Sequence, residues 1–283
     1  NDWRCRTILV TPAGPDVGGL WLVTSPIDVP SNKVLRSTVD TQLPVLLASG
    51  ASMQYKPMIQ IINRTNVTLR RLNLQGQKLA GDGIVISGSS YVTVTMSVVA
   101  RFTEFGVYLT DKSNNTVVIN WNTIDDIGTD NGPTSYWGIG VRSSGDFHST
   151  VYVDNNVISA AYYGVALANC GGSSANKCFV RMNTIKPRRP YDSSGGSGID
   201  LNQADYAEVG SNSVYGYDDE CSTTPGVVCD CGMGITVDDN RGSSIHDNVI
   251  DGCMGAGIAV ANGAVPANKP WVDTGNFVEH NTI

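Results

Sequence analysis

A four-residue phrase returns seven times along this chain of 283 residues and limits its fold more than any other feature. The phrase is a glycine, an aliphatic residue, any residue and a second aliphatic residue. Its copies begin at Gly83, Gly106, Gly138, Gly164, Gly198, Gly234 and Gly257. A second phrase, Asn-x-Ile or Asn-x-Val, follows the later copies at Asn122, Asn156, Asn183, Asn212, Asn248 and Asn281. Repeats of roughly 20–50 residues indicate a solenoid or another repeat array.

Each repeat has the character of β structure. Alternating aliphatic positions bury one face of a strand, and clusters of Gly, Asn, Ser and Asp separate the short runs. Three short strands and three turns in about 25 residues form one coil of a parallel β-helix. We therefore expect an all-β chain of about eight or nine coils with little helix and with the glycine phrases aligned in one sheet. The repeated asparagines are expected to form a ladder of side-chain hydrogen bonds inside one turn, a structural role without chemistry.

Several segments resemble the right-handed parallel β-helix superfamily, the pectate-lyase-like fold. Residues 26–37 (PIDVPSNKVLRS) resemble its capping region, and residues 66–76 and 89–99 resemble its early coils. The resemblance covers nearly the whole chain and implies one right-handed domain, with capping and first coils in residues 1–60 and regular coils in residues 61–283. We expect the natural polypeptide to continue beyond residue 283, because the sequence stops within a coil.

The superfamily resemblance leaves the reaction open. The superfamily contains pectate and alginate lyases, polygalacturonases, uronan epimerases, tailspike glycanases and non-enzymatic stalks. The fold alone does not show which of these functions a member has. The catalytic motifs of these enzymes are not complete here. Asp238-Asp239 matches one polygalacturonase motif, whereas His246 lies in a different strand from the one that the Gly-His-Gly motif requires. No catalytic residue can therefore be transferred.

Charge and hydropathy exclude some partners. The formal net charge is −7 and the sequence pI is about 4.8, which disfavours nucleic acid and anionic membranes as partners. No apolar run is long enough to span a bilayer. An acidic polysaccharide stays compatible with this charge, because a local basic patch can lie on an acidic body.

The cysteines predict an oxidising compartment and a secreted protein. Cys170 and Cys178 flank one small polar loop, and Cys221 and Cys229 flank another. The expected disulfides are Cys170–Cys178, Cys221–Cys229 and Cys231–Cys253, with Cys221–Cys231 and Cys229–Cys253 as the alternative. Cys5 is left unpaired or bonded outside the chain, and a zinc site from the last four cysteines is the less favoured interpretation. The sequons predict glycosylation at Asn63, Asn66 and Asn114 in a eukaryotic secretory pathway.

Polar outward positions concentrate in the middle of the glycine-phrase strands. In this superfamily substrates lie along the outer face of one strand column, and here alternation turns the third residue of each phrase and the residue after its fourth outward. Arg142, Asp200, Asn202 and Asp238 are therefore expected to share one outer face, and Tyr108 lies further along the same column. The segments Lys186–Ser197 and Tyr215–Met233 are expected to wall this face as a groove. The candidates for binding sugar or carboxylate lie in the segments that precede the glycine phrases, and they are Arg188, Arg189, Tyr191 and Tyr163.

Asp200 and Asp238 are the strongest catalytic candidates. They lie on adjacent coils but are offset by two residues, which separates their backbones by about 8 Å. Such a spacing suits the acid and base of an inverting glycosidase. Asp238 with Asp239 offers an alternative, an oxygen-ligand calcium site, so the cofactor is either none or calcium. Outward aspartates that only solubilise the sheet are a third interpretation.

Two functional hypotheses follow from these features. The first is a secreted hydrolase or lyase of an acidic polysaccharide, in which Asp200 and Asp238 act as acid and base and Arg142 binds a carboxylate or, in a lyase, removes the neighbouring proton. The second is a non-catalytic structural or adhesive β-helix of an extracellular fibre, stalk or tailspike, with self-association or a further chain at its C-terminal end. The first hypothesis is the leading interpretation, and the second draws its support from the incomplete catalytic motifs and from the expected open last coil.

Overall fold

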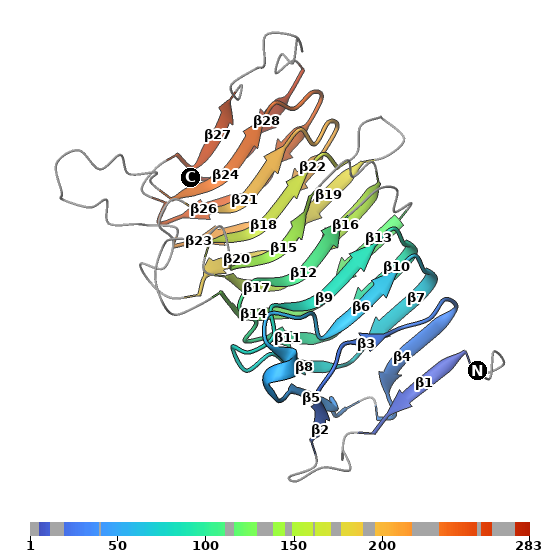
Figure 1. The fold of residues 1–283 in the computed structure, drawn as a ribbon. Coiled ribbons are helices and arrows are strands. Elements are labelled where there is room, and N and C mark those ends of the chain that lie inside the picture. Colours follow the sequence, from blue (N-terminus) through green and yellow to red (C-terminus); the bar gives the residue numbers. More distant parts are fainter. Residues whose placement is uncertain are drawn as a thin grey trace.

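The computed structural model describes residues 6–11, 20–39, 41–110, 116–128, 138–144, 149–160, 162–170, 177–188, 196–216, 232–253, 256–261 and 275–283. These residues form 28 strands and one 3-10 helix, η1 (Ala51–Met53), and they contain no α-helix. The strands wind around one axis as three parallel sheets, from the blue N-terminal coils to the red C-terminal coils in Figure 1. This is the parallel β-helix that the repeats predict.

Each coil contributes one strand to each sheet. Sheet 1 contains β1 (Thr7–Val10), β4 (Lys33–Ser37), β7 (Thr65–Arg70), β10 (Ser90–Thr95), β13 (Thr116–Asn120), β16 (Thr150–Asp154), β19 (Cys178–Arg181), β22 (Glu208–Gly210), β25 (Ser244–His246) and β28 (Phe277–Glu279). Sheet 2 contains β2 (Trp21–Val23), β5 (Val45–Ala48), β8 (Asn73–Gln75), β11 (Val98–Ala100), β14 (Thr123–Ile127), β17 (Val157–Ala160), β20 (Thr184–Pro187), β23 (Ser213–Tyr215) and β26 (Val249–Asp251). Sheet 3 contains β3 (Ile27–Asp28), β6 (Ile59–Ile62), β9 (Asp82–Ser87), β12 (Phe105–Thr110), β15 (Ile139–Ser143), β18 (Tyr163–Ala168), β21 (Ser197–Asn202), β24 (Met233–Asp238) and β27 (Ile258–Ala261). The described chain thus completes nine coils and begins a tenth with β28, and strands within residues 1–60 already belong to the three sheets.

The glycine phrases all lie in sheet 3, as predicted. Most of their aliphatic residues point inward, and Val107, Leu109, Val165 and Ile199 are fully buried in one continuous core, whereas Ile139 of the phrase at Gly138 packs with Phe105 and Ala166 in a separate cluster. Burying a side chain of this size stabilises the fold by about 1.5–3 kcal/mol relative to exposing it. The core therefore fixes which neighbouring residues face outward.

The predicted asparagine ladder is present in the turn between sheets 1 and 2. The side chain of Asn183 accepts hydrogen bonds from the backbone N–H and the amide of Asn156, at 2.9 and 3.1 Å. Its own amide donates to the carbonyl of Val153 and to Asn212 Oδ1, at 2.8 and 3.0 Å. The same pattern repeats at Asn122, Asn156, Asn212 and Asn248 and ends on Asn281. Each ladder residue thereby satisfies buried polar groups of three coils.

One turn of each coil uses a left-handed residue directly before the ladder position. Trp121, Asn155, Met182 and Ser211 have φ values between 55° and 58° there, although none is glycine. Only a few per cent of non-glycine residues adopt this conformation. The ladder hydrogen bonds and the inward packing on either side hold the turn in place.

The structure corrects the register of one phrase. The strand pairing aligns Gly106 with Gly140, because Phe105 pairs with Ile139 and Val107 with Val141, so Gly138 lies before the aligned row. A Cβ at Gly106 would lie 2.6 Å from the carbonyl oxygen of Gly140, so the row needs glycine where adjacent coils approach closely. At this coil the aligned phrase therefore begins two residues later than predicted.

The Cys170–Cys178 disulfide is present, as its spacing predicts, and both residues are fully buried. Cys253 is half-buried, and its predicted partner Cys231 lies outside the described residues. Cys5, Cys221 and Cys229 lie outside them too, so the remaining pairings stay predictions. Asn63 and Asn66 have exposed positions that glycosylation requires, whereas Asn114 is not described.

Candidate functional site

Sheet 3 presents two outward rows of side chains along the helix axis. The first row contains Tyr108, Arg142, Ala166, Asp200, Thr236 and Ala259. The second row contains Thr110, Ala168, Asn202 and Asp238. Arg142 therefore lies in the same row as Asp200. The register predicted from Gly138 would have placed it in the row of Asn202, two residues further along the strand.

Ser143 explains why this register was hard to predict. It takes the inward position that an aliphatic residue occupies in the other phrases, and it is 2% exposed. Its hydroxyl donates to the carbonyl of Ala168 at 3.0 Å and accepts from the N–H of Ala168 at 2.9 Å. Because both bonds satisfy the hydroxyl, a serine is tolerated at this buried position.

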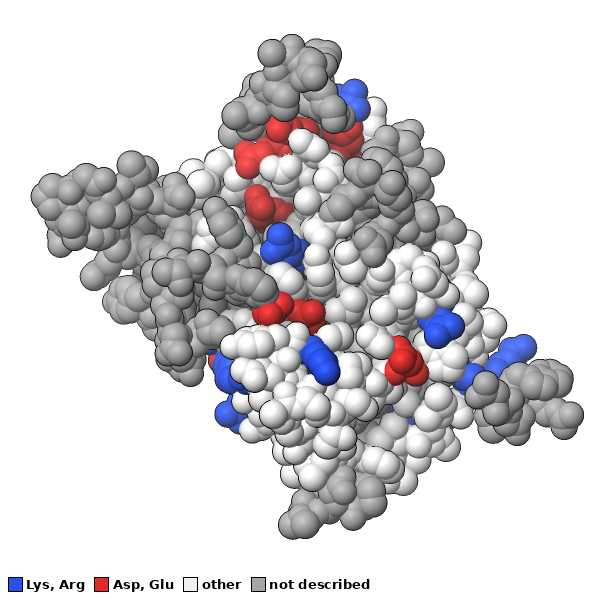
Figure 2. Space-filling model, in the orientation of Figure 1, with Lys and Arg blue, Asp and Glu red and all other residues white. Residues whose placement is uncertain are grey.

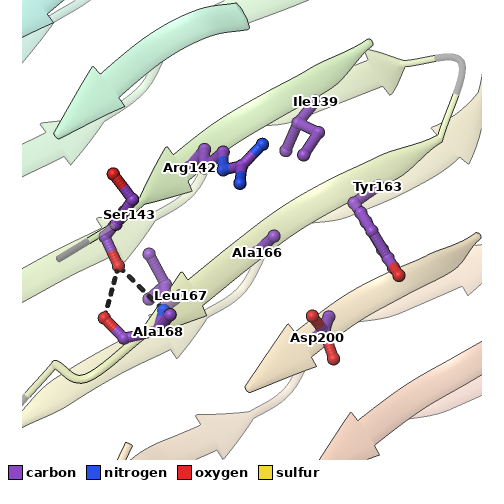
Figure 3. Close-up of a pocket in the computed structure, with 9 residues that line it drawn as sticks. Ile139, Arg142, Ser143, Tyr163, Ala166, Leu167, Ala168 and Asp200 are labelled. Carbon is purple, nitrogen blue, oxygen red and sulfur yellow. Dashed lines mark hydrogen bonds between the residues drawn. The ribbon is translucent and has the colours of Figure 1, made fainter. Parts of the chain in front are cut away.

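A pocket opens where the outward side chains of β18 are smallest. Ala166 and Ala168 form its floor, and Arg142 and Asp200 lie on opposite sides of Ala166 (Figure 3). The pocket volume is about 260 Å³, and its lining residues are Ile139, Arg142, Ser143, Ser144, Tyr163, Ala166, Leu167, Ala168 and Asp200. The neighbouring coils carry larger side chains, so the hollow is a direct result of the two alanines.

Arg142 is held by aromatic contacts on the N-terminal side of the pocket. Its guanidinium lies 5.0 Å from the centroid of the Phe105 ring, and Phe105 packs against Tyr108 with 4.7 Å between ring centroids. The Tyr108 hydroxyl is hydrogen-bonded to Ser144 at 2.6 Å. A cation over an aromatic face is stabilised by about 0.5–2 kcal/mol. These contacts give the pocket a positioned positive charge.

Asp200 lies opposite Arg142 in an environment that disfavours its charged form. Burial, together with the nearby charge of Asp238, raises the pKa of Asp200 from 3.8 to about 7, although Arg142 opposes the shift. A carboxyl group with such a pKa exchanges protons near neutral pH, as a general acid or base requires.

Asp238 lies one coil further on and is displaced along the strand. It pairs with Asn202, whereas Asp200 pairs with Thr236, so the two aspartates have the predicted offset. Their backbones are then about 8 Å apart. Asp239 follows in a left-handed turn with φ 54° and is 9% exposed. Within the described ranges no three His, Cys, Asp or Glu residues form a group that could hold a metal, so calcium at Asp238 and Asp239 stays a prediction.

The other predicted substrate-binding residues differ in outcome. Tyr108, Tyr163 and Asn202 lie on the outer face of sheet 3 at or beside the pocket. Arg188 was expected there too, but its side chain is 3% exposed. It donates to the carbonyl of Gly128 at 2.9 Å and pairs with Asp126 at 3.7 Å, so it has a structural role instead. Arg189, Tyr191 and most of the two predicted walls lie outside the described residues.

Two further acidic residues on sheet 3 were missed by the sequence analysis. Asp82 begins β9, and Glu104 directly precedes β12. Burial and the neighbouring Glu104 raise the pKa of Asp82 from 3.8 to about 7, and burial raises the pKa of Glu104. Asp82 directly precedes a glycine phrase, so its row could have been aligned like the others, but its burial beside Glu104 could not be inferred from the local sequence.

The charge distribution on this side of the molecule is uneven. Figure 2 shows acidic side chains near the C-terminal coils at the top, whereas much of the remaining described surface is uncharged.

The described part of the chain contains no helix that is long and apolar enough to cross a membrane.

Comparison with known proteins identifies the family. A family profile described as "Right handed beta helix region" matches residues 51–214. The chain belongs to this family. Its β-helix is therefore right-handed, as the resemblance implied. No curated protein sequence matches the chain.

Solved structures share the right-handed β-helix at low sequence identity. ORF18 of Geobacillus virus E2 is 12% identical with a TM-score of 0.55, over 97% of this chain and 52% of that protein. The A-module of the Azotobacter vinelandii mannuronan C-5 epimerase AlgE4 is 14% identical with a TM-score of 0.45, over 98% and 88%. The Dettilon tailspike protein is 15% identical with a TM-score of 0.44, over 97% and 60%. The chain thus spans about half the length of the Geobacillus virus protein, and these likenesses concern the fold alone.

Proposed function

We propose that this protein cleaves an acidic polysaccharide bound along the outer face of sheet 3. The observation that carries the proposal is the pocket that Arg142 and Asp200 line on opposite sides of Ala166. Arg142 supplies a charge that pairs with a carboxylate or sulfate of the substrate. Asp200 supplies a carboxyl group that titrates near neutral pH, because its pKa is raised to about 7.

In a hydrolysis reaction Asp200 and Asp238 have separate roles. Protonated Asp200 donates its proton to the glycosidic oxygen as the bond from that oxygen to the anomeric carbon breaks. Asp238 accepts a proton from a water molecule, whose oxygen forms the new bond to the anomeric carbon. Carboxyl groups about 6.5–9.5 Å apart leave room for this water and invert the configuration. The backbone offset of Asp200 and Asp238 is compatible with this range.

β-Elimination would use the same pocket differently. Arg142 would neutralise the uronate carboxylate, and a basic group would remove the adjacent proton while the glycosidic oxygen leaves. The two reactions are separated by measuring reducing ends and ultraviolet absorbance together on uronate-containing, sulfated and neutral polysaccharides. New reducing ends without absorbance indicate hydrolysis, and both signals together indicate elimination. Neither signal on any acidic polysaccharide would refute cleavage.

The pH profile is expected to show the titration of Asp200. As the general acid, Asp200 must carry a proton in the free enzyme, and its pKa is about 7. We therefore expect kcat/KM to fall above about pH 7, by tenfold for each further pH unit. Initial rates on one glycan between pH 5 and pH 9 measure this limb. A rate that rises steadily through this range would show that the proton donor is another group.

Arg142 is expected to select anionic substrates. Replacing it with methionine keeps an unbranched side chain over Phe105 but removes the charge. A lost charge-assisted hydrogen bond of about 1.5–3 kcal/mol corresponds to a roughly 10–100-fold weaker binding of acidic oligosaccharide. Calorimetric titration with an acidic oligosaccharide and its neutral counterpart tests this, because binding of the neutral one is expected to change little. Equal losses for both ligands would contradict charge recognition.

A non-catalytic adhesive or structural β-helix is the second candidate. The pocket volume of about 260 Å³ favours it, since it lies below the roughly 300–1,000 Å³ usual for ligand pockets. In that case the outer face would bind glycans without turnover, and wild-type protein would retain an oligosaccharide intact. In either case the Cys170–Cys178 disulfide supports an oxidising, extracellular location.

A further inference from the structure

Asp82 and Glu104 bring two carboxyl groups together on adjacent coils, and neither residue lines the Arg142–Asp200 pocket. Asp82 begins β9, and Glu104 lies next to Phe105, the residue that pairs with Asp82. The two groups repel each other, which contributes to the raised pKa of Asp82. Among the described residues neither group has an ion-pair partner.

Asp82 also carries an oxygen without a partner. Its side chain is 8% exposed, and its Oδ1 atom is buried without a hydrogen bond within the described part of the chain. The Phe105 backbone N–H is the hydrogen-bond donor that favours the charged form of this carboxyl group. A buried oxygen without a partner costs about 1–3 kcal/mol, so such an atom indicates an absent ligand or proton.

Gly81, the residue before Asp82, lies close to a third oxygen and to Glu104. A Cβ on Gly81 would lie 3.0 Å from the carbonyl oxygen of Tyr55 and 3.3 Å from the carboxyl carbon of Glu104. The Tyr55 carbonyl oxygen and the Glu104 carboxyl group therefore lie close to the same point beside Gly81. Tyr55 has a left-handed backbone with φ 56°, a conformation uncommon for a residue other than glycine.

We propose that Asp82, Glu104 and the carbonyl oxygen of Tyr55 bind a divalent cation between β9 and β12. The donors are all oxygens, and two are carboxylates, which is the ligand set that Ca²⁺ prefers and that thiol- and imidazole-seeking metals do not. A cation removes the repulsion between the two carboxylates and gives the buried Asp82 oxygen a partner. It also ties the segment around Tyr55 to two successive coils. The site does not depend on cleavage of a polysaccharide.

Calcium titration of the metal-stripped protein tests this site. Calorimetry of the wild-type chain with CaCl₂ is expected to show one site, and Ca²⁺ is expected to raise the melting temperature. Asp82→Asn and Glu104→Gln are each expected to weaken this binding at least tenfold. Asp251→Asn, which changes an exposed carboxylate on sheet 2, is expected to leave it unchanged.

Two outcomes would overturn the proposal. One is a wild-type chain that binds no Ca²⁺ at millimolar concentration, which would mean that the two carboxyl groups share a proton instead. The other is calcium binding that neither Asp82→Asn nor Glu104→Gln weakens. Glu104 is only half-buried, so Glu104→Gln gives a folded variant even if Asp82→Asn disturbs the coil, and circular dichroism verifies the fold of each.

Discussion

Asp200→Asn is expected to lower the rate of glycan cleavage by about 10²–10⁴-fold, because asparagine cannot transfer the proton that this carboxyl group carries. Binding of the acidic oligosaccharide is expected to persist, since Arg142 is unchanged. The measurement compares kcat and the dissociation constant of wild type and variant on one substrate. Loss of binding without loss of turnover would contradict the role assigned to Asp200.

The stability of this variant separates catalysis from folding. The folded state holds the Asp200 proton up to a pKa of about 7, whereas the reference value is 3.8. The folded state therefore binds more protons in this window, and its unfolding free energy falls as the pH rises from about 4 to about 7. Asparagine does not ionise, so it removes the destabilisation that charged Asp200 causes at high pH. Asp200→Asn is therefore expected to melt no lower than wild type at pH 8. Asp251→Asn serves as the activity control and is expected to keep wild-type turnover.

Asn183→Ala is expected to destabilise the fold by about 3–5 kcal/mol and to lower the melting temperature by roughly 10 °C. The substitution removes four buried hydrogen bonds. The Asn156 N–H and the Val153 carbonyl then lose their partners inside the coil. Thermal denaturation followed by circular dichroism measures the change.

Two variants control this experiment. Thr184→Ala changes the next residue, which is exposed, and is expected to shift stability by less than about 0.5 kcal/mol. Asn183→Asp keeps the acceptor oxygens but loses the amide donor, so an intermediate loss is expected. Equal stability of Asn183→Ala and Thr184→Ala would show that the ladder contributes little.

The fold was predictable because its signal repeats. The glycine phrases and the ladder asparagines recur once per coil, and period-two burial then determined which residues face outward. The error at Gly138 arose where two glycines lie two residues apart and Ser143 replaces an aliphatic residue. The alternation is the same in either register, so only the strand pairing with Phe105 and Val107 decides between them.

The site was less predictable because it depends on distances between coils and on burial. Arg188 lies in a segment rich in basic residues, but its partners Asp126 and Gly128 are 60 or more residues away in sequence. Asp82 and Glu104 belong to different repeats, and nothing in their local sequence reports that one is buried beside the other. The Arg142–Asp200 pocket likewise exists only because Ala166 lies between them in the stack.

The two small residues of β18 make the recognition surface adjustable one coil at a time. Ala166 and Ala168 face outward, whereas Val165 and Leu167 between and beside them anchor the strand in the core. A larger side chain at Ala166 would occupy the space between Arg142 and Asp200, and one at Ala168 would fill the adjoining part of the pocket floor, while the inward packing stayed the same. Ligand preference and folding stability are thus encoded by alternate residues of one strand, so each can change by mutation without the other.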